Sequence, residues 1–153
     1  MISIRKEIEY VEAYLSIQKH RYKEKLSYEI AFSPELYGLK IMKLLIQPLV
    51  ENAIYHGIKG MDALGHIKIT GEREDSTVVI RVGDNGVGIS EEQLRALNEG
   101  SVEPSTQGGV GVKNVQERIR LTFGAEFGVR LESVPGRGTT ATVRIPMIPG
   151  DGA

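Results

Sequence analysis

The sequence predicts an α/β fold, a two-layer sandwich in which a mixed, mostly antiparallel sheet carries helices on one face. Apolar residues recur three and four positions apart in some segments, as on a helix face, and alternate with polar residues in others, as in half-buried strands. The pattern gives three to four helices and roughly five strands with two hairpins. At 153 residues, 41% of them hydrophobic, the chain supports one core and is short for two.

Helices account for much of the first third of the chain. Apolar residues spaced by four, three and four predict a helix over residues 3–22, and they are Ile4, Ile8, Val11 and Leu15. After a predicted strand over Leu26–Phe32, Ser33 and Pro34 offer an N-cap and a first-turn proline. A long helix is therefore expected from there to His56-Gly57. Pro48 inside it removes a backbone donor and predicts a kink.

The rest of the chain alternates short strands with two helices. His66–Gly71 and Thr77–Gly83 are expected to form a hairpin around a charged tip. Ser90 with Gln93 makes a capping box, so a short helix should run to Leu97. The remaining predicted segments are a polar, mobile loop over Asn98–Gly109, a helix over Val110–Phe123, strands over Val129–Ser133 and Thr139–Ile145, and a tail over 149–153.

Composition excludes several classes of function. The 19 Lys and Arg residues nearly balance the 20 Asp and Glu residues, and a net charge of −1 argues against a broad nucleic-acid or membrane surface. The absence of cysteine excludes disulfides and thiolate metal sites. No run is long enough to span a membrane, and the charged first ten residues do not resemble a signal peptide.

Asp84 is the first candidate binding residue. It ends a predicted strand, where its carboxylate can accept a hydrogen bond from the exocyclic amine of adenine, and Gly86 and Gly88 allow the backbone to turn against the ring. The alternative is an ordinary Asp-Asn-Gly turn, which is the commoner use of that tripeptide.

Asn52 and His56 form a second candidate. They lie four residues apart and share one helix face. An amide oxygen can join the coordination sphere of Mg²⁺ beside phosphate oxygens. The alternative is a helix C-terminus, with His56 near the last carbonyls and Gly57 after them.

Two further glycine pairs complete the pattern. Gly109 and Gly111 open a helix that carries Lys113 and Asn114, and free amides at that end could bind an anion, although a loop hinge explains them equally well. Gly136-Arg137-Gly138-Thr139 reads as a turn between the last two strands. No Walker A motif is present, and the three histidines lack metal-ligand spacing.

In this order the motifs resemble the N, G1, G2 and G3 boxes of the GHKL ATP-binding superfamily, which includes gyrase, heat-shock chaperones, histidine kinases and MutL. The resemblance narrows to sensor histidine kinases of the LytS/YesM type and covers about Ile4 to Pro146. The matching segments are Gln47–Gly57 (QPLVENAIYHG), Gly109–Gly124 (GVGVKNVQERIRLTFG) and Glu7–Arg21 (EIEYVEAYLSIQKHR).

This resemblance implies a Bergerat-type fold that binds ATP and Mg²⁺. Asn52 would hold the metal ion, Asp84 would recognise adenine, and Asn98–Gly109 would be the ATP lid. Asn52 and Lys113 would position phosphates, and no residue would act as a base. The ATP-binding residues it predicts are Asn52, His56, Asp84, Gly86, Gly88, Gly109, Gly111, Lys113, Asn114 and Thr139.

The sequence departs from the family at two positions. Tyr55 stands where the family usually has a lysine that contacts phosphate, and Lys59, Lys113 or Arg118 are candidates to replace it. Pro48 stands where the ATP-hydrolysing branches have a general-base glutamate, which favours a kinase. Glu51 lies about 100° around the helix from Asn52 and is a less natural base.

The resemblance implies a protein histidine kinase catalytic domain in two-component signal transduction. Residues 1–24 would be a linker helix from an upstream dimerisation and phosphoacceptor domain, 25–148 the catalytic domain and 149–153 a tail. None of His20, His56 and His66 has the setting of the phosphoacceptor, so the chain is expected not to phosphorylate itself. A response regulator would be an indirect partner, and the domain would be cytoplasmic beneath a membrane sensor. The alternatives are a nucleotide-responsive binding module, which Tyr55 favours, and an anti-sigma-type serine kinase.

Overall fold

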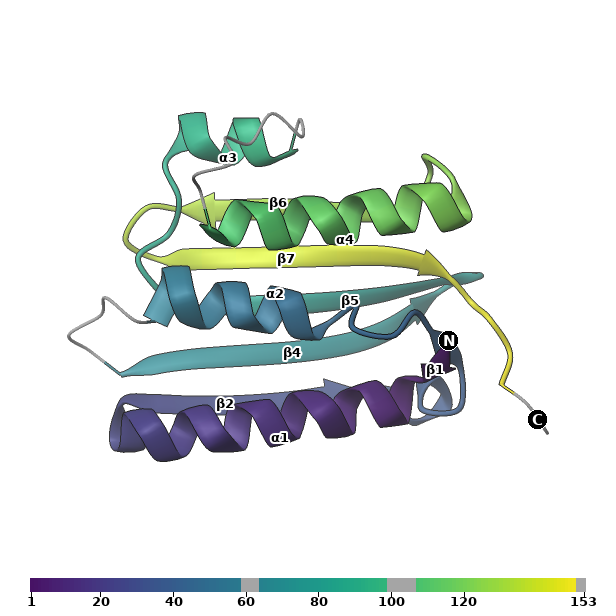
Figure 1. The fold of residues 1–153 in the computed structure, drawn as a ribbon, viewed down its shortest axis with the longest axis horizontal. Coiled ribbons are helices and arrows are strands. Elements are labelled where there is room, and N and C mark those ends of the chain that lie inside the picture. The colour runs from purple at the N-terminus through teal and green to yellow at the C-terminus, as the bar shows by residue number, and fades with distance from the viewer. Residues whose placement is uncertain (59–63, 99–106, 151–153) are drawn as a thin grey trace.

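The computed structural model describes residues 1–58, 64–98 and 107–150 and has two layers (Figure 1). A five-stranded sheet forms one layer. Across one face of it lie the helices α1 (Ile4–Tyr22), α2 (Gln47–Asn52) and α4 (Gln107–Phe123), while α3 (Glu91–Asn98) packs beside one edge. The predicted fold class is confirmed. Within the described ranges, no helix has the length and apolar character needed to cross a bilayer.

The sheet has the order β2-β4-β5-β7-β6. Only β2 and β4 are parallel, and the other pairs are antiparallel, with β4–β5 and β6–β7 forming the two expected hairpins. The strands are β2 (Leu26–Phe32), β4 (Gly65–Glu74), β5 (Thr77–Asp84), β6 (Gly128–Val134) and β7 (Gly138–Pro146). A separate pair joins β1 (Ile2–Ser3) to β3 (Lys40–Ile41), and the short helical segments are η1 (Lys23–Lys25), η2 (Pro34–Leu36) and η3 (Ala53–Ile58).

Side-chain alternation along the strands decides what faces the helices. Val78, Ile80 and Val82 of β5 belong to the buried core, which also contains the apolar stripe of α1. Because side chains two positions apart point to the same side of a strand, Asp84 also lies on the helix-covered side. The same rule places Thr139 of β7 there, directly opposite Asp84 in the strand register. The sheet therefore delivers both residues to the underside of the helical layer.

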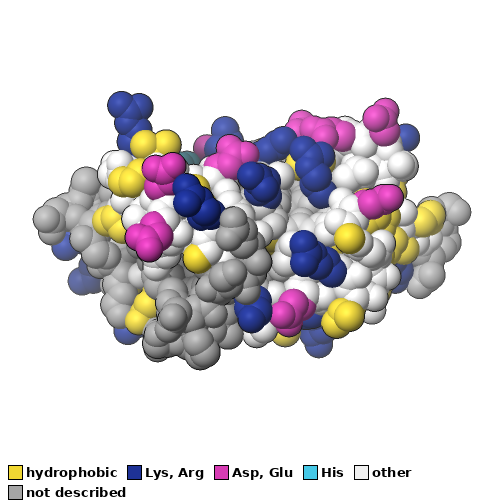
Figure 2. Space-filling view, turned by 90° about the horizontal axis from the view of Figure 1, so that it is seen from above, with side chains coloured by type: hydrophobic (Ala, Val, Ile, Leu, Met, Phe, Trp, Pro, Cys, Tyr) yellow, Lys and Arg dark blue, Asp and Glu magenta, His cyan; other side chains and the backbone are white. Residues whose placement is uncertain are grey.

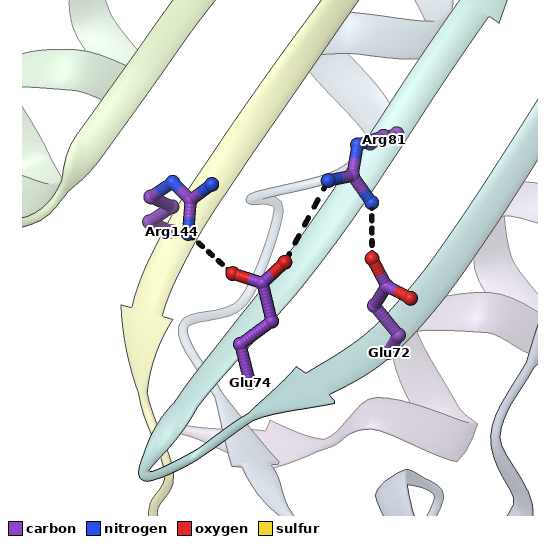
Figure 3. A network of polar contacts seen from close by, with 4 residues as sticks. All are labelled: Glu72, Glu74, Arg81 and Arg144. Carbon is purple, nitrogen blue, oxygen red and sulfur yellow. Dashed lines mark hydrogen bonds and ion pairs between the residues drawn. The ribbon is translucent and has the colours of Figure 1, made fainter.

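The opposite face of the sheet is polar and carries a network of exposed charges (Figure 3). Arg81 Nη1 donates to Glu72 Oε1 at 2.5 Å, and Arg144 Nη1 donates to Glu74 Oε2 at 2.8 Å. The hydrogen bond from Arg144 lowers the pKa of Glu74. On another side of the molecule, the edge that carries α3 and β6, acidic and basic side chains are likewise interspersed rather than gathered by sign (Figure 2). Exposed pairs of this kind contribute little to stability.

The expected long helix over residues 34–57 is wrong in its first part. The chain instead makes η2, the short strand β3 and a loop, and α2 begins only at Gln47, with Pro48 in its first turn. A proline there leaves no helical hydrogen bond unmade, so it opens the helix and does not kink it. The helix α4 begins at Gln107, earlier than expected, and most of the predicted loop over Asn98–Gly109 lies outside the described residues.

A buried carboxylate from α1 fixes the start of α2. Glu7 is 0% exposed, and its Oε2 accepts hydrogen bonds from the amides of Ile46 (2.9 Å) and Gln47 (3.4 Å). Its Oε1 accepts from the amide of Leu44 at 3.0 Å. The amides at a helix start have no partner within the helix, and a negative charge there is favourable. Glu7 thus serves as a capping group supplied from 39 residues away in the sequence.

An arginine from α4 holds the same loop from the other side. Arg118 donates to the carbonyls of Lys43 (2.5 Å) and Leu44 (2.9 Å). Leu44 has a φ of +59°, a left-handed conformation that is strained for a branched side chain. Its amide is bound by Glu7 and its carbonyl by Arg118, so the strained turn is secured at both polar groups.

We expect Glu7→Leu to lower the free energy of unfolding by at least about 3 kcal/mol, because it leaves several amides without acceptors in a buried site. Glu7→Gln, which keeps one acceptor oxygen, should cost less. Urea denaturation followed by circular dichroism measures both. Glu12→Gln, on the exposed side of α1, is the matched control and should change stability by less than about 0.5 kcal/mol. Equal stability of Glu7→Leu and the wild type would contradict the capping role.

Candidate functional site

The helix α2 continues without a break into η3, a π-helical segment over Ala53–Ile58. Such wider turns are rare and often occur at functional sites. The end of η3 comes down onto the end of β5 at Gly57. A Cβ atom at Gly57 would lie 2.5 Å from Asp84 Oδ1 and 2.7 Å from its Cγ, so only glycine permits this approach. The contact brings the helical layer directly against the Asp84 carboxyl group.

Asp84 is a partly buried acceptor at the bottom of this contact. Burial raises its pKa from the ordinary 3.8 to about 6, and backbone hydrogen bonds from Gly86 and Thr139 act in the opposite direction. The Gly86 amide donates to Asp84 Oδ1 at 2.8 Å. At neutral pH the group is therefore a carboxylate in a poorly solvated place, where an added hydrogen-bond donor would stabilise it.

The loop after Asp84 is hydrogen-bonded to two neighbouring segments, the end of η3 and the turn between β6 and β7. The Val87 amide donates to the Gly57 carbonyl at 3.2 Å, and the Val87 carbonyl accepts from the Gly136 amide at 2.7 Å. Gly88 has a φ of +78°, and a Cβ there would lie 2.5 Å from the Val134 carbonyl oxygen. The loop is thus fixed by hydrogen bonds and close contacts with the protein's own backbone.

Asn85 and Ser133 tie this region to the sheet. Asn85 Oδ1 accepts from the His66 amide at 2.6 Å, and its Nδ2 donates to the Leu64 carbonyl at 3.1 Å. Ser133 Oγ accepts from the Ile89 amide at 2.8 Å and lies 2.9 Å from Thr139 Oγ1. Sequence reasoning missed both as structural members of the site, because their partners are distant in the sequence.

A hollow of about 470 Å³ opens between α1 and α2. It is lined by α1, by α2 with η3, and by Gly111 in the second turn of α4. Asn52 and Tyr55 form part of its wall. Asn52 is half-buried and makes no hydrogen bond within the described ranges, so its amide is available to a ligand. The volume falls within the ~300–1,000 Å³ of small-molecule pockets.

Comparison with known proteins identifies the family. The sequence model of the histidine kinase-, DNA gyrase B- and HSP90-like ATPases matches residues 38–149. The chain belongs to this family. That range contains α2, η3, the loop after Asp84 and α4, while the α1 wall of the hollow precedes it.

Sensor proteins are among the curated relatives. The chain is 34% identical over 147 residues to the sensor histidine kinase YesM of Bacillus subtilis and 32% identical over 145 residues to the sensor protein LytS of Staphylococcus saprophyticus. In both cases the match covers 95% of this chain and 24% of the relative. The chain therefore spans about a quarter of the length of the proteins it resembles.

Solved structures agree on the fold. The catalytic domain of histidine kinase ThkA superposes with a TM-score of 0.73 at 18% identity, covering 97% of each chain. The mycobacterial sensor histidine kinase MprB gives 0.64 at 16% identity, covering 93% of this chain and 95% of that one. Identities this low establish the architecture alone.

The structure gathers the predicted site residues into two groups. One group surrounds the end of β5 and consists of Asp84, Gly86, Gly88 and Thr139. The other borders the hollow and consists of Asn52 and Gly111. The first turn of α4 contains Gly109, and His56 lies within η3, with its side chain outside the described part. Lys113 and Asn114 lie on α4 and do not line the hollow.

Three cations were candidates to supply the charge that the family's lysine has where this chain has Tyr55, and the structure places each of them differently. Arg118 is committed to the carbonyls of Lys43 and Leu44. Lys59 lies outside the described residues. Lys113 is half-buried on α4.

We expect Asp84→Asn to raise the free energy of unfolding at pH 8. Because the folded-state pKa of about 6 lies above the ordinary 3.8, the wild type loses stability as the pH rises through this window. The amide does not titrate, so the variant should gain about 1–3 kcal/mol above pH 7 and little near pH 4. Urea denaturation at the two pH values measures this.

Asp75→Asn, at the exposed tip between β4 and β5, is the matched control and should change stability little at either pH. A stability difference between Asp84→Asn and the wild type that is the same at pH 4 and pH 8 would show that ionisation of Asp84 does not oppose folding.

Proposed function

We propose that this chain is the catalytic domain of a sensor histidine kinase, which binds Mg-ATP and presents it to a histidine on a separate phosphoacceptor domain. The observation that carries the proposal is the Asp84 carboxylate, held in a partly buried place beneath η3 and beside a loop fixed by its own hydrogen bonds. A carboxylate has about four lone-pair positions, so Asp84 can accept a further hydrogen bond from a ligand beside those from Gly86 and Thr139.

Adenine fits the Asp84 end of the site. Its exocyclic amine would donate to the Asp84 carboxylate, and the backbone of Gly57 lies close against the loop after Asp84 with no side chain of Gly57 or Gly86 between them. Thr139 supports this end by holding its neighbour Asp84 through a backbone hydrogen bond. The base is then recognised by a single strong polar contact in a fixed frame, as in most small-molecule sites.

The phosphates fit the hollow beside Asn52. An amide oxygen suits Mg²⁺, which keeps several waters and takes few protein ligands when phosphate oxygens are present. Gly111, in the second turn of α4, lines the same hollow and adds no side chain to it. Mg-ATP would supply the phosphoryl group and the neutralising cation, while Asn52 would orient them.

Transfer to another domain is favoured over hydrolysis of ATP. Pro48, one turn before Asn52, also lines the hollow and offers no base. The neighbouring carboxylate, Glu51, accepts a hydrogen bond from Gln47 Nε2 at 3.1 Å. Without a base aimed at a water, the residues of the hollow can only position phosphates. A response regulator would then receive the phosphoryl group, and the domain would work on the cytoplasmic side of a membrane sensor.

The runner-up is a nucleotide-responsive module that binds ATP or ADP without useful transfer. Tyr55 is the observation that favours it, because it lines the hollow and carries no charge. Addition of a phosphoacceptor domain from a LytS/YesM-type kinase discriminates the two: phosphohistidine on that domain supports the kinase, and nucleotide binding without transfer supports the module.

Calorimetric titration with a non-hydrolysable ATP analogue tests the site. We expect binding that is stronger with Mg²⁺ than without it. Asp84→Asn should weaken binding by about 10- to 100-fold in both conditions, which is the loss of one hydrogen bond to a charged group. Asn52→Ala should remove the effect of Mg²⁺ and leave the metal-free affinity nearly unchanged.

Asp75→Asn is again the control for a surface change of the same chemistry. Absence of nucleotide binding in the wild type would overturn the proposal. Undiminished binding by Asp84→Asn would place the nucleotide elsewhere on the chain.

A further inference from the structure

The hollow beside Asn52 has a second wall, which belongs to α1. Tyr14, Gln18, Arg21 and Tyr22 line it from that helix, opposite Asn52 and Tyr55. This part of the chain precedes the segment that the family model matches, residues 38–149. The proposed phosphate end of the site is therefore built in part by a helix that the family match does not include.

Arg21 is the cation of this wall. Within the described ranges its guanidinium group makes no hydrogen bond and no ion pair, and the side chain is exposed. Its charge also reaches Tyr14, another residue of this wall. Burial raises the pKa of Tyr14, the nearby Glu51 adds to this, and Arg21 opposes it. Arg21 and Glu51 thus face the same hollow with opposite charges, and neither neutralises the other through a direct contact.

The other described cations near the hollow are accounted for. Arg118 is bound to the carbonyls of Lys43 and Leu44, and Lys19 Nζ donates to the Leu26 carbonyl at 2.9 Å. Lys113 lies on α4 and is not among the residues that line the hollow. On the wall formed by α2 and η3 there is Glu51 but no cation among the lining residues. Among the described residues that line the hollow, Arg21 of α1 is the one positive side chain that a triphosphate would meet.

We infer that Arg21 binds the terminal phosphate of the nucleotide and so distinguishes a triphosphate from a diphosphate. This inference rests on the proposed function, since it needs the nucleotide to lie with its phosphates in the hollow. The guanidinium group suits the role because its planar donors match two phosphate oxygens at once. It also supplies, from the opposite wall, the positive charge that Tyr55 lacks.

The test compares the affinities for ADP and for a non-hydrolysable ATP analogue, both with Mg²⁺, by calorimetry. We expect Arg21→Gln to weaken the binding of the analogue by about tenfold or more, as for the loss of a hydrogen bond between charged groups. Binding of ADP should change by less than about twofold, because ADP lacks the terminal phosphate. Lys25→Gln, an exposed cation just after α1 that does not line the hollow, is the matched control and should change neither affinity.

A rescue variant makes the test specific. Tyr55→Lys places a cation on the facing wall, so the double variant Arg21→Gln with Tyr55→Lys should recover most of the preference for the analogue over ADP. Equal weakening of both nucleotides by Arg21→Gln, or no weakening at all, would overturn the inference. Loss of the preference in Lys113→Gln but not in Arg21→Gln would assign the role to α4 instead.

Failure of this inference and failure of the proposed function would give different results. If the wild type binds neither nucleotide, both fail. If it binds both in a way that depends on Asp84, and Arg21→Gln leaves the preference intact, the proposed function stands and the inference fails.

Discussion

The hydrogen bonds from Leu44, Ile46 and Gln47 to the buried carboxylate of Glu7 are the constraint on which the rest of the site depends. They set where α2 begins, and α2 with η3 forms a continuous helical run from Gln47 to Ile58. Asn52 and Gly57 both lie on that run, one beside the hollow and one against Asp84. A shift at its start would move both, because a helix transmits a displacement of its first turn to every later residue.

Whereas burial of Glu7 stabilises the fold, burial of Asp84 lowers the stability of the protein at neutral pH. Its carboxylate is held where water solvates it poorly, which raises its pKa and makes the charged form unfavourable for folding. The surrounding backbone compensates only in part, through the amides of Gly86 and Thr139. A binding site that needs a poorly solvated acceptor must accept this loss of stability, and the large core beneath the three helices allows it.

Much of this architecture could be predicted from the sequence, and the reasons are local. Alternation along β5 and β7 predicted strands that bring Asp84 and Thr139 to one edge, and the apolar stripe of α1 predicted its buried face. The segment before α2 could not be predicted, because Ser33-Pro34 and Pro48 are both plausible helix starts and the acceptor that chooses between them, Glu7, is remote in sequence. The same limit applies to Arg118, whose charge suggested phosphate but whose partners are two carbonyls of a strained loop.

The two ends of α1 contribute to the site in different ways. Near its start, Glu7 fixes the beginning of α2, and near its end, Arg21 lines the hollow beside Asn52. The apolar stripe between them, from Ile8 to Leu15, packs into the same core as α2 and the sheet. Since α1 is held by that core and also holds the helix that carries Asn52, it cannot move as a separate body without changing the hollow. The helix that the sequence predicts to connect to an upstream domain is therefore physically a wall of the hollow, and a change in its position would alter the proposed phosphate end of the site before the Asp84 end.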